Sequence, residues 1–204
     1  MRPSSAPPRA TPGWLATARA VGSSRWIVLL PVCGLLFVVA LDAALASRRW
    51  PVVLTGLIDE PGHLVTAALL LAALLPRRAR ALWPWALAGS VLLDVDHVPL
   101  YSFWPGIAAE GGGRPVTHSL ITAAVLLAGA AAVKRWRIPL VGLAVGVLLH
   151  LVRDLASGPG APLLFPWTEA WVRVSERSYL AVVAVAAVVA TVRLARAVSA
   201  ARSG

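Results

Sequence analysis

The sequence contains very little cysteine, lysine or acid. Cys33 is the only cysteine, which excludes a disulfide framework and a cysteine-based metal site, and its apolar surroundings predict a small core residue. Charged residues make up 14% of the 204 positions, whereas hydrophobic residues make up 58%. Together with a mean hydropathy of +0.76, this composition excludes an ordinary soluble domain and indicates an integral membrane protein.

The few charged residues are mostly cationic. The formal net charge is +10, and Lys134 is the one lysine among 19 cations. A basic balance can indicate nucleic-acid binding, but most of these arginines adjoin apolar runs, where cations anchor a protein at a membrane surface. We therefore expect no nucleic-acid partner, and the oligomeric state stays open.

Apolar runs bounded by charge, proline or glycine predict an all-α, polytopic membrane bundle of about six helices, forming one domain over residues 25–198. The expected spans are about 26–46, 60–76, 82–100, 116–133, 138–155 and 178–198. The first and the last span contain almost no polar residues for the interior. Before the last span, proline and glycine interrupt a stretch rich in Trp, Phe and Leu, which predicts a re-entrant or interfacial segment.

The two ends of the chain are expected to lie outside the bundle. Residues 1–24 are rich in Pro, Ser, Ala and Arg and predict a disordered basic cytoplasmic tail, with a signal peptide as the alternative. Residues 199–204 are expected to form a cytoplasmic C-terminal tail. With both termini inside, most cations lie on the cytoplasmic side, which predicts a multi-pass protein of the cell (inner or plasma) membrane in this orientation.

The histidines fall in one layer of the predicted bundle, on its extracytoplasmic side. They are His63, His97, His118 and His150. Four aspartates lie within four residues of a histidine, namely Asp59, Asp94, Asp96 and Asp154. Spacings of three or four residues, which place acid and imidazole on one helix face, occur in the pairs Asp59–His63, Asp94–His97 and His150–Asp154.

This combination of side chains predicts a metal site. Neutral imidazoles and carboxylates suit a divalent transition metal, most simply Zn²⁺, with Mn²⁺ or Fe²⁺ as alternatives, and the number of acids allows one to three ions. Sites with several ions commonly activate a water and stabilise a phosphoryl or acyl displacement. The alternative is a proton or ion pathway, which intramembrane Asp and His chains also build.

Three stretches of the sequence resemble the YdjM-type family of membrane-bound, metal-dependent hydrolases. They are DVDH at 94–97, GGGRPVTHSL at 111–120 and HLVRDLASGPGAPLLFPW at 150–167, and with His63 the resemblance covers roughly residues 56–170. Two positions depart from the family pattern, because Gly113 replaces the usual His before the Arg and Pro115 replaces a Gly. The family is regarded as distantly related to zinc phospholipase C and P1 nuclease, and this relation implies phosphoester hydrolysis.

The resemblance, taken with the spacings, gives an expected set of metal ligands. The set is His63, Asp94, His97, His118, His150 and Asp154. Asp59 and Asp96 are expected to be catalytic, as the general base, or otherwise ligands or orienters of imidazoles. Because Asp94 and His97 share a helix face, Asp96 is expected to face a different partner or a second ion.

The polar residues near the predicted ligands have expected roles as well. Arg114 is expected to hold a phosphate of the substrate, with interfacial anchoring as the alternative. Thr117 and Ser119 flank His118 and are expected to contact substrate or to cap the next helix. Arg153 is expected to pair with the neighbouring Asp154.

The leading expectation is a metal-dependent hydrolase, namely a phosphoesterase that acts on a lipid or lipid-linked substrate at the extracytoplasmic membrane face. One alternative is a metal-independent PAP2-like lipid phosphatase, although its motif pieces occur here in the wrong order and Ala144 replaces an expected Arg. The other alternative is a non-enzymatic metal or proton transporter. Polar residues confined to one layer disfavour it, because transport needs a path across the membrane.

Overall fold

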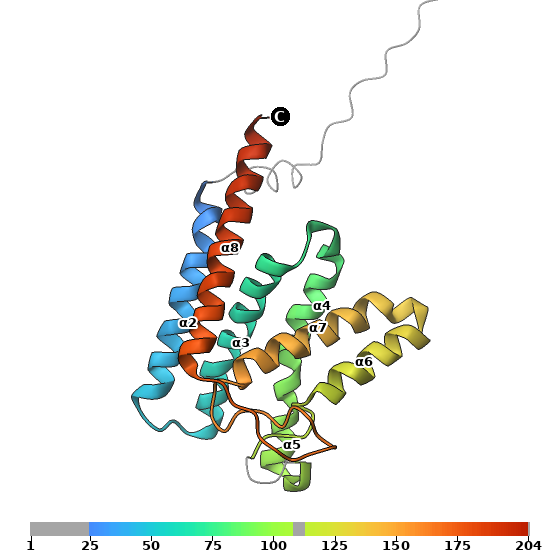
Figure 1. The fold of residues 1–204 in the computed structure, drawn as a ribbon. Coiled ribbons are helices and arrows are strands. Elements are labelled where there is room, and N and C mark those ends of the chain that lie inside the picture. Colours follow the sequence, from blue (N-terminus) through green and yellow to red (C-terminus); the bar gives the residue numbers. More distant parts are fainter. Residues whose placement is uncertain (1–24, 108–112, 204) are drawn as a thin grey trace, which may run out of the picture.

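The computed structural model describes residues 25–107 and 113–203, and this part of the chain is all-helical, without β-strands (Figure 1). The helices are α2 (Leu30–Ser47), α3 (Val52–Leu74), α4 (Trp83–Leu92), α5 (His97–Ser102), α6 (Leu120–Ala132), α7 (Arg137–Asp154) and α8 (Glu176–Ser203). Short 3₁₀ turns are η1 (Arg25–Leu29), η2 (Arg77–Leu82), η3 (Leu93–Asp96), η4 (Pro105–Ile107) and η5 (Lys134–Trp136). The tail expected at 1–24 lies outside the described residues.

Among the described residues, four helical segments are long and apolar enough to cross a membrane. They are Trp26–Ser47, Val53–Leu74, Lys134–Asp154 and Glu176–Ser203. Helix α6 is apolar but has only 13 residues, which gives a length of about 20 Å against a hydrocarbon core of about 30 Å. The fold class of a membrane helical bundle is therefore confirmed, whereas the expectation of six full spans stays a prediction.

The helix boundaries differ from the expected spans in three places. Helix α3 begins at Val52 and continues through Pro61, although DEPGH reads as a start signal for a helix. The third expected span is divided into α4, η3 and α5, and the tightened 3₁₀ turn occurs where Asp94 and Asp96 interrupt the apolar run. Helix α8 runs to Ser203, so residues 199–203 continue this helix, and their place on the cytoplasmic side stays a prediction.

The helices form two packed groups that meet at α3. Helices α2, α3 and α8 share one hydrophobic cluster, which includes Val38, Leu70 and Val183. Helices α6 and α7 share a second cluster around Ala123 and Val147, and α4 packs along α7. Because α3 also contacts α4 and α7, it connects the two groups. Figure 1 shows the end of α2, the start of α3, α5 and the loop after α7 at one end of the bundle, opposite the C-terminus.

Glycines allow α4 and α7 to approach each other very closely. A Cβ atom at Gly89 would lie 2.6 Å from the Leu143 carbonyl oxygen, and a Cβ at Gly146 would overlap the Ala86 carbonyl oxygen. Small residues of this kind let two helix backbones touch in a membrane, where packing drives association. The contact brings the end of α4 beside the end of α7, and these ends carry several of the predicted ligands.

The segment between α7 and α8 has an irregular backbone. Within it, Ala161 and Val172 form an antiparallel bridge, and the amide of Leu120 at the start of α6 donates to the Leu163 carbonyl. The backbone bends sharply at Gly160, whose φ of 92° favours glycine. The segment thereby covers one end of the bundle, as expected of a non-spanning stretch, while its depth in a membrane stays a prediction.

Cys33 does not lie in the core. Its side chain is exposed on α2, where the neighbouring Val32 and Leu36 are exposed as well. Around Cys33, helix α2 is apolar on every face, so its hydrophobic pattern does not distinguish the face toward α3 and α8 from the face toward lipid. The prediction of a small core residue is therefore wrong.

Candidate metal centre

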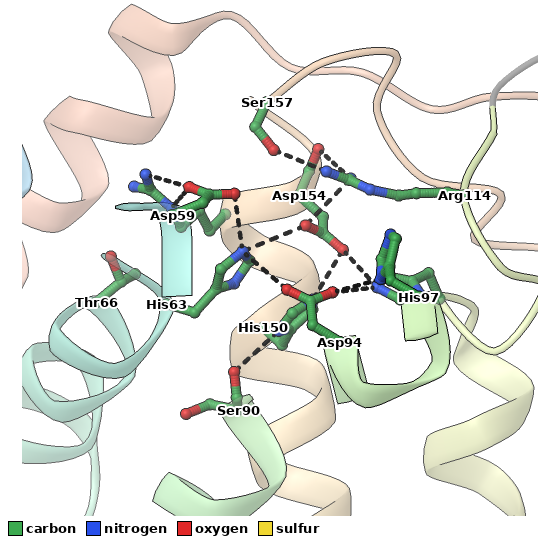
Figure 2. Close-up of polar contacts among 12 residues, drawn as sticks. Asp59, His63, Thr66, Ser90, Asp94, His97, Arg114, His150, Asp154 and Ser157 are labelled. Atoms are coloured by element: carbon green, nitrogen blue, oxygen red, sulfur yellow. Dashed lines mark hydrogen bonds and ion pairs between the residues drawn. The ribbon is translucent and has the colours of Figure 1, made fainter. Parts of the chain in front are cut away.

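Four chain segments converge at the end of the bundle that the irregular segment covers. They are the first half of α3, the η3–α5 turn, residues 114–119 and the last turn of α7. Figure 2 shows side chains from these segments pointing toward one another. The six predicted ligands all lie in this region, and together with Asp96 they form two adjacent groups.

The first group combines both acids of the η3 turn with two imidazoles. Its members are Asp94, Asp96, His97 and His118, whose candidate ligand atoms lie within 4.8 Å of one another. The His97 Nδ1 atom is 3.2 Å from an oxygen of each aspartate. The His118 Nε2 atom is 2.9 Å from Asp94 Oδ1. This group is only partly buried, because Asp94 and His97 are 22% and 24% exposed.

The second group is fully buried and consists of His63, His150 and Asp154. The two imidazole rings are stacked, with centroids 3.8 Å apart. Asp154 Oδ2 lies 3.1 Å from His150 Nε2, and Asp154 Oδ1 lies 3.6 Å from His63 Nε2. Three protein ligands match the ligand number of catalytic rather than structural zinc sites.

Asp94 connects the two groups. Its Oδ1 atom lies near His118 and His97 of the first group and 3.4 Å from His150 Nε2 of the second. Its Oδ2 atom is 4.0 Å from His63 Nε2. One carboxylate therefore faces all four imidazoles.

Unpartnered buried atoms gather at this centre, which tests whether its residues fit a metal. Among the described residues, the buried side-chain atoms without a hydrogen-bond partner are Asp42 Oδ2, Glu60 Oε2, His63 Nδ1 and Nε2, Asp96 Oδ1, His97 Nδ1, His118 Nδ1, His150 Nε2 and Asp154 Oδ2. All but the first belong to the converging segments. Buried polar atoms without partners are rare and costly, whereas imidazole nitrogen and carboxylate oxygen are good ligands for transition metals. The centre could therefore hold a metal ion.

The orientation of His150 is fixed from outside the centre. Its Nδ1 atom lies 2.9 Å from the Ser90 carbonyl oxygen. Ser90 lies in the last turn of α4, where carbonyl groups lack partners within the helix. Donation from Nδ1 leaves Nε2 with a free lone pair toward Asp94 and Asp154, which is the usual arrangement of a metal-binding histidine.

Asp96 shares His97 and His118 with Asp94, which the sequence did not predict. We expected Asp96 to face a different partner, yet its oxygens lie 3.2 Å from His97 Nδ1 and 3.5 Å from His118 Nδ1. The reason is the 3₁₀ turn, which winds at three residues per turn and so rotates Asp96 back toward the Asp94 face. Asp96 does have a second partner as well, because its Oδ2 atom accepts a hydrogen bond from the Thr117 hydroxyl.

The residues expected to bind substrate are engaged within the protein. Arg114 Nη1 donates to the carbonyls of Asp154 and Gly160 and lies 3.1 Å from Asp154 Oδ1, and its Nη2 donates to Ser157 Oγ. Ser119 is fully buried and donates to the Val116 carbonyl. These contacts tie the loop to the centre, and neither Thr117 nor Ser119 caps α6 with its side chain.

Arg153 does not pair with Asp154. It donates to Asp59, to Asp42 and to the Tyr179 hydroxyl, and it is buried. Successive residues on a helix point about 100° apart, so Arg153 faces α2, α3 and α8 while Asp154 faces the centre. The first and last spans thus supply polar interior groups, Asp42 and Tyr179, which the sequence interpretation missed because each is isolated in an apolar run.

Asp59 lies between this arginine and the centre. Its Oδ1 atom accepts from Arg153, and its Oδ2 atom is 3.4 Å from His63 Nε2. Asp59 is not part of either group of potential ligands. Its neighbour Glu60 was missed by the sequence interpretation, although it precedes His63 by three residues; its carboxyl interacts with that of Asp94.

His97 and Asp96 lie outside the four helices that are long enough to cross a membrane. Burial lowers the pKa of His97, but the adjacent carboxylates of Asp94 and Asp96 outweigh this and raise it to about 9. Burial raises the pKa of Asp96, but hydrogen bonds with His118 and His97 outweigh this and leave it below its usual value. The metal-free centre therefore holds a proton on His97 at neutral pH.

No curated protein and no solved structure matches the chain in the comparisons with known proteins. A family model does match, over residues 58–203, and its description is "YdjM inner membrane protein". The matched region contains both ligand groups and excludes α2. On the strength of this match, which covers well over half of its length, the chain belongs to the YdjM inner membrane protein family.

Proposed function

We propose that this membrane protein is a metal-dependent hydrolase, and that its substrate is a phosphoester of a lipid or lipid-linked molecule. The observation that carries the proposal is the set of buried, unpartnered imidazole and carboxylate atoms in the two ligand groups. Burying such atoms without a partner costs free energy, which a bound cation would offset. The favoured ion is Zn²⁺, with Mn²⁺ or Fe²⁺ as alternatives, and two adjacent groups favour two ions.

In this proposal the six ligands are His63, Asp94, His97, His118, His150 and Asp154. A bound ion of this kind supplies Lewis acidity toward a phosphoryl oxygen and lowers the pKa of a bound water. Ser90 and Arg114 fix the orientations of His150 and Asp154. Asp96 lies beside both imidazoles of the first group, with Oδ1 3.2 Å from His97 Nδ1, so its carboxylate is the candidate that would accept a proton from an attacking water.

A lipid substrate is supported by the surroundings of the centre. Asp94 and His97 are its more exposed members, so the opening lies at the η3–α5 turn. The nearby segments expose Tyr101, Phe103 and Trp104, and the His97 and Tyr101 rings are 5.8 Å apart. Exposed aromatic side chains at one end of a membrane bundle are typical of the headgroup layer.

We place this opening on the extracytoplasmic side. The N-terminus of α2 and the C-terminus of α8 lie at the opposite end of the bundle (Figure 1). Arg78, Arg80 and Lys134 lie in short loops after α3 and α6. Both helices run away from the centre, so these cations belong to the opposite end of the bundle. Arg153 is buried, so it does not count as a loop cation in the positive-inside comparison.

The two alternative functions receive less support. Arg153 belongs to the HLVRD stretch that resembles a PAP2-like motif, but two carboxylates and a tyrosine occupy its guanidinium, so it is not free for a phosphate. A transporter needs ionisable groups along a path across the membrane. The ionisable groups of the centre and those around Arg153 instead gather at one end of the bundle. Neither alternative explains the unpartnered imidazoles as well as a metal does.

The test is metal content and phosphoester hydrolysis by the purified protein in detergent. We expect tightly bound metal, cleavage of a chromogenic phosphoester and of a phospholipid, and loss of both metal and activity in His150→Ala. Ser199→Ala, an exposed change on α8 far along the chain from the centre, should leave both unchanged. Metal-free protein that still cleaves phosphoesters would contradict the proposal and favour the PAP2-like alternative.

A further inference from the structure

Arg153 forms a second buried polar cluster beside the metal centre. Its side chain is 2% exposed and contacts three helices other than its own. Nη2 donates to Asp42 Oδ1 of α2 at 2.7 Å, and Nη1 donates to the Tyr179 hydroxyl of α8 at 2.9 Å. The Tyr179 hydroxyl also bonds to Thr66 Oγ1 of α3 at 2.6 Å. We call Arg153, Asp42, Asp59, Tyr179 and Thr66 the arginine cluster.

Arg153 binds only one carboxylate oxygen of Asp59, and the other oxygen faces the metal centre. Both Nε and Nη2 donate to the same atom, Asp59 Oδ1, at 2.8 and 2.6 Å. Asp59 Oδ2 takes no part in this contact and lies 3.4 Å from His63 Nε2. That nitrogen is also the one that faces Asp154 and Asp94. Arg153 therefore fixes the direction in which Asp59 presents its second oxygen.

Gly62 provides the space that this arrangement needs. A Cβ atom at Gly62 would lie 2.6 Å from the Arg153 Cζ atom and within 2.9 Å of Nη2 and Nε. The guanidinium group thus rests directly on the backbone of α3, one residue before His63. Any side chain at position 62 would displace the guanidinium and with it the bonds to Asp59.

The cluster includes a helix that the family match does not cover. The match begins at residue 58, whereas Asp42 belongs to α2. Two carboxylates can accept hydrogen bonds from more of the N–H groups of a buried arginine than one carboxylate can. An unpaired buried charge is costly, so the second carboxylate matters. Helix α2 thus helps to hold Arg153, whose partner Asp59 contacts the candidate metal centre in the matched region.

We propose that Arg153 is a positioning residue of the metal centre, acting through Asp59, and that Asp42 and Tyr179 hold it in place. The inference rests on the proposed metal-binding function. It predicts that displacing the guanidinium changes the environment of the bound metal even when every ligand of the two groups is intact. Outer-sphere groups of this kind typically change metal affinity by about 10- to 100-fold.

The sharpest test compares two glycine substitutions in the same helix. Gly62→Ala displaces the guanidinium, whereas a Cβ atom at Gly56 meets nothing within 4 Å, so Gly56→Ala is the matched control. The protein is loaded with Co²⁺, whose visible absorption reports ligand geometry, and Co²⁺ affinity is measured by titration. We expect Gly62→Ala to shift the absorption bands and to weaken Co²⁺ binding by about tenfold or more, and Gly56→Ala to match the wild type.

Two further variants guard against a simple folding defect. Arg153→Lys keeps the charge but loses the fork of donors, and Asp42→Asn loosens the cluster from the α2 side without touching Asp59. Helicity and thermal midpoint are recorded for each. Folded variants with unchanged Co²⁺ spectrum and affinity, even if less heat-stable, would overturn the inference and leave the cluster a structural brace. Wild-type protein that binds no Co²⁺ would instead contradict the proposed function.

Discussion

At the scale of single residues, the carboxylates of the centre differ in how many imidazoles each one contacts. Asp94 contacts imidazoles of both groups, whereas Asp96 contacts only the first. Glu60 adds a further carboxyl beside Asp94 and has a buried oxygen without a partner. Neighbouring carboxylates repel unless a proton or a cation lies between them. The carboxylates are therefore expected to contribute unequally to metal binding, and substituting each one should cause a different loss of metal.

Asp94→Asn should remove metal from both groups, because the carboxylate that faces all four imidazoles is lost. Asp96→Asn should weaken binding by about 10- to 100-fold without abolishing it, as for a supporting group. Metal per protein chain, measured by elemental analysis at a fixed free Zn²⁺ concentration, checks the ranking. Equal losses in the two variants would contradict the central position assigned to Asp94.

Metal binding should release protons. The raised pKa of His97, about 9 in the metal-free centre, means that this imidazole is protonated at neutral pH, and a metal ligand must be neutral. Affinity should therefore fall as pH is lowered from 9 toward 6. Calorimetric titration in buffers of different ionisation enthalpy should count at least about one proton released per centre at pH 7; a count of zero would show that His97 is not a ligand.

At the scale of helices, the spacing of polar residues within one helix was predictable and the contacts between helices were not. The pairs Asp59–His63, Asp94–His97 and His150–Asp154 could be found because a helix face repeats every three to four residues. The contact between Arg153 and Asp42 joins residues 111 positions apart, and no local pattern encodes it. The 3₁₀ turn that brings Asp96 into the first group was also hidden, since α and 3₁₀ windings use the same residues.

The packing of α4 against α7 should control the metal centre from a distance. Gly146→Ala places a Cβ against Ala86 and Gly89, which forces the two helices apart and separates Asp94 from His150. Overpacking of this kind costs about 1–3 kcal/mol, so the thermal midpoint in detergent should fall and metal content should fall with it. Gly129→Ala on α6, where a Cβ meets only Leu140 at an ordinary 3.4 Å, is the matched control and should change neither.

At the scale of the whole molecule, the bundle has two unlike ends. One end carries the candidate metal centre, the exposed Phe103 and Trp104 and the irregular segment, and the other carries the start of α2 and the end of α8 (Figure 1). The sequence predicted this division because the histidines fall at corresponding ends of successive spans. It did not predict how far each helix extends, since apolar composition continues past several helix ends.

The orientation can be tested with single introduced cysteines, once the native Cys33, which is exposed, has been removed. In a Cys33→Ser background, Phe103→Cys should react with a membrane-impermeant maleimide added to intact cells, because Phe103 is 75% exposed at the end that carries the centre. Ser203→Cys at the end of α8 should react only after the cells are opened. Labelling of Ser203→Cys alone in intact cells would place the metal centre in the cytoplasm and reverse the assignment.

The arginine cluster has a consequence for how the chain is inserted during synthesis. Arg153 lies in α7, near the end of a segment long enough to span, and an arginine costs about 2.5–3.5 kcal/mol at the centre of an inserting helix and less toward its end. Its carboxylate partners, Asp42 and Asp59, belong to α2 and α3 and leave the ribosome first. The acids are therefore already in place when α7 arrives, and they can receive its arginine from the translocation channel before it meets lipid.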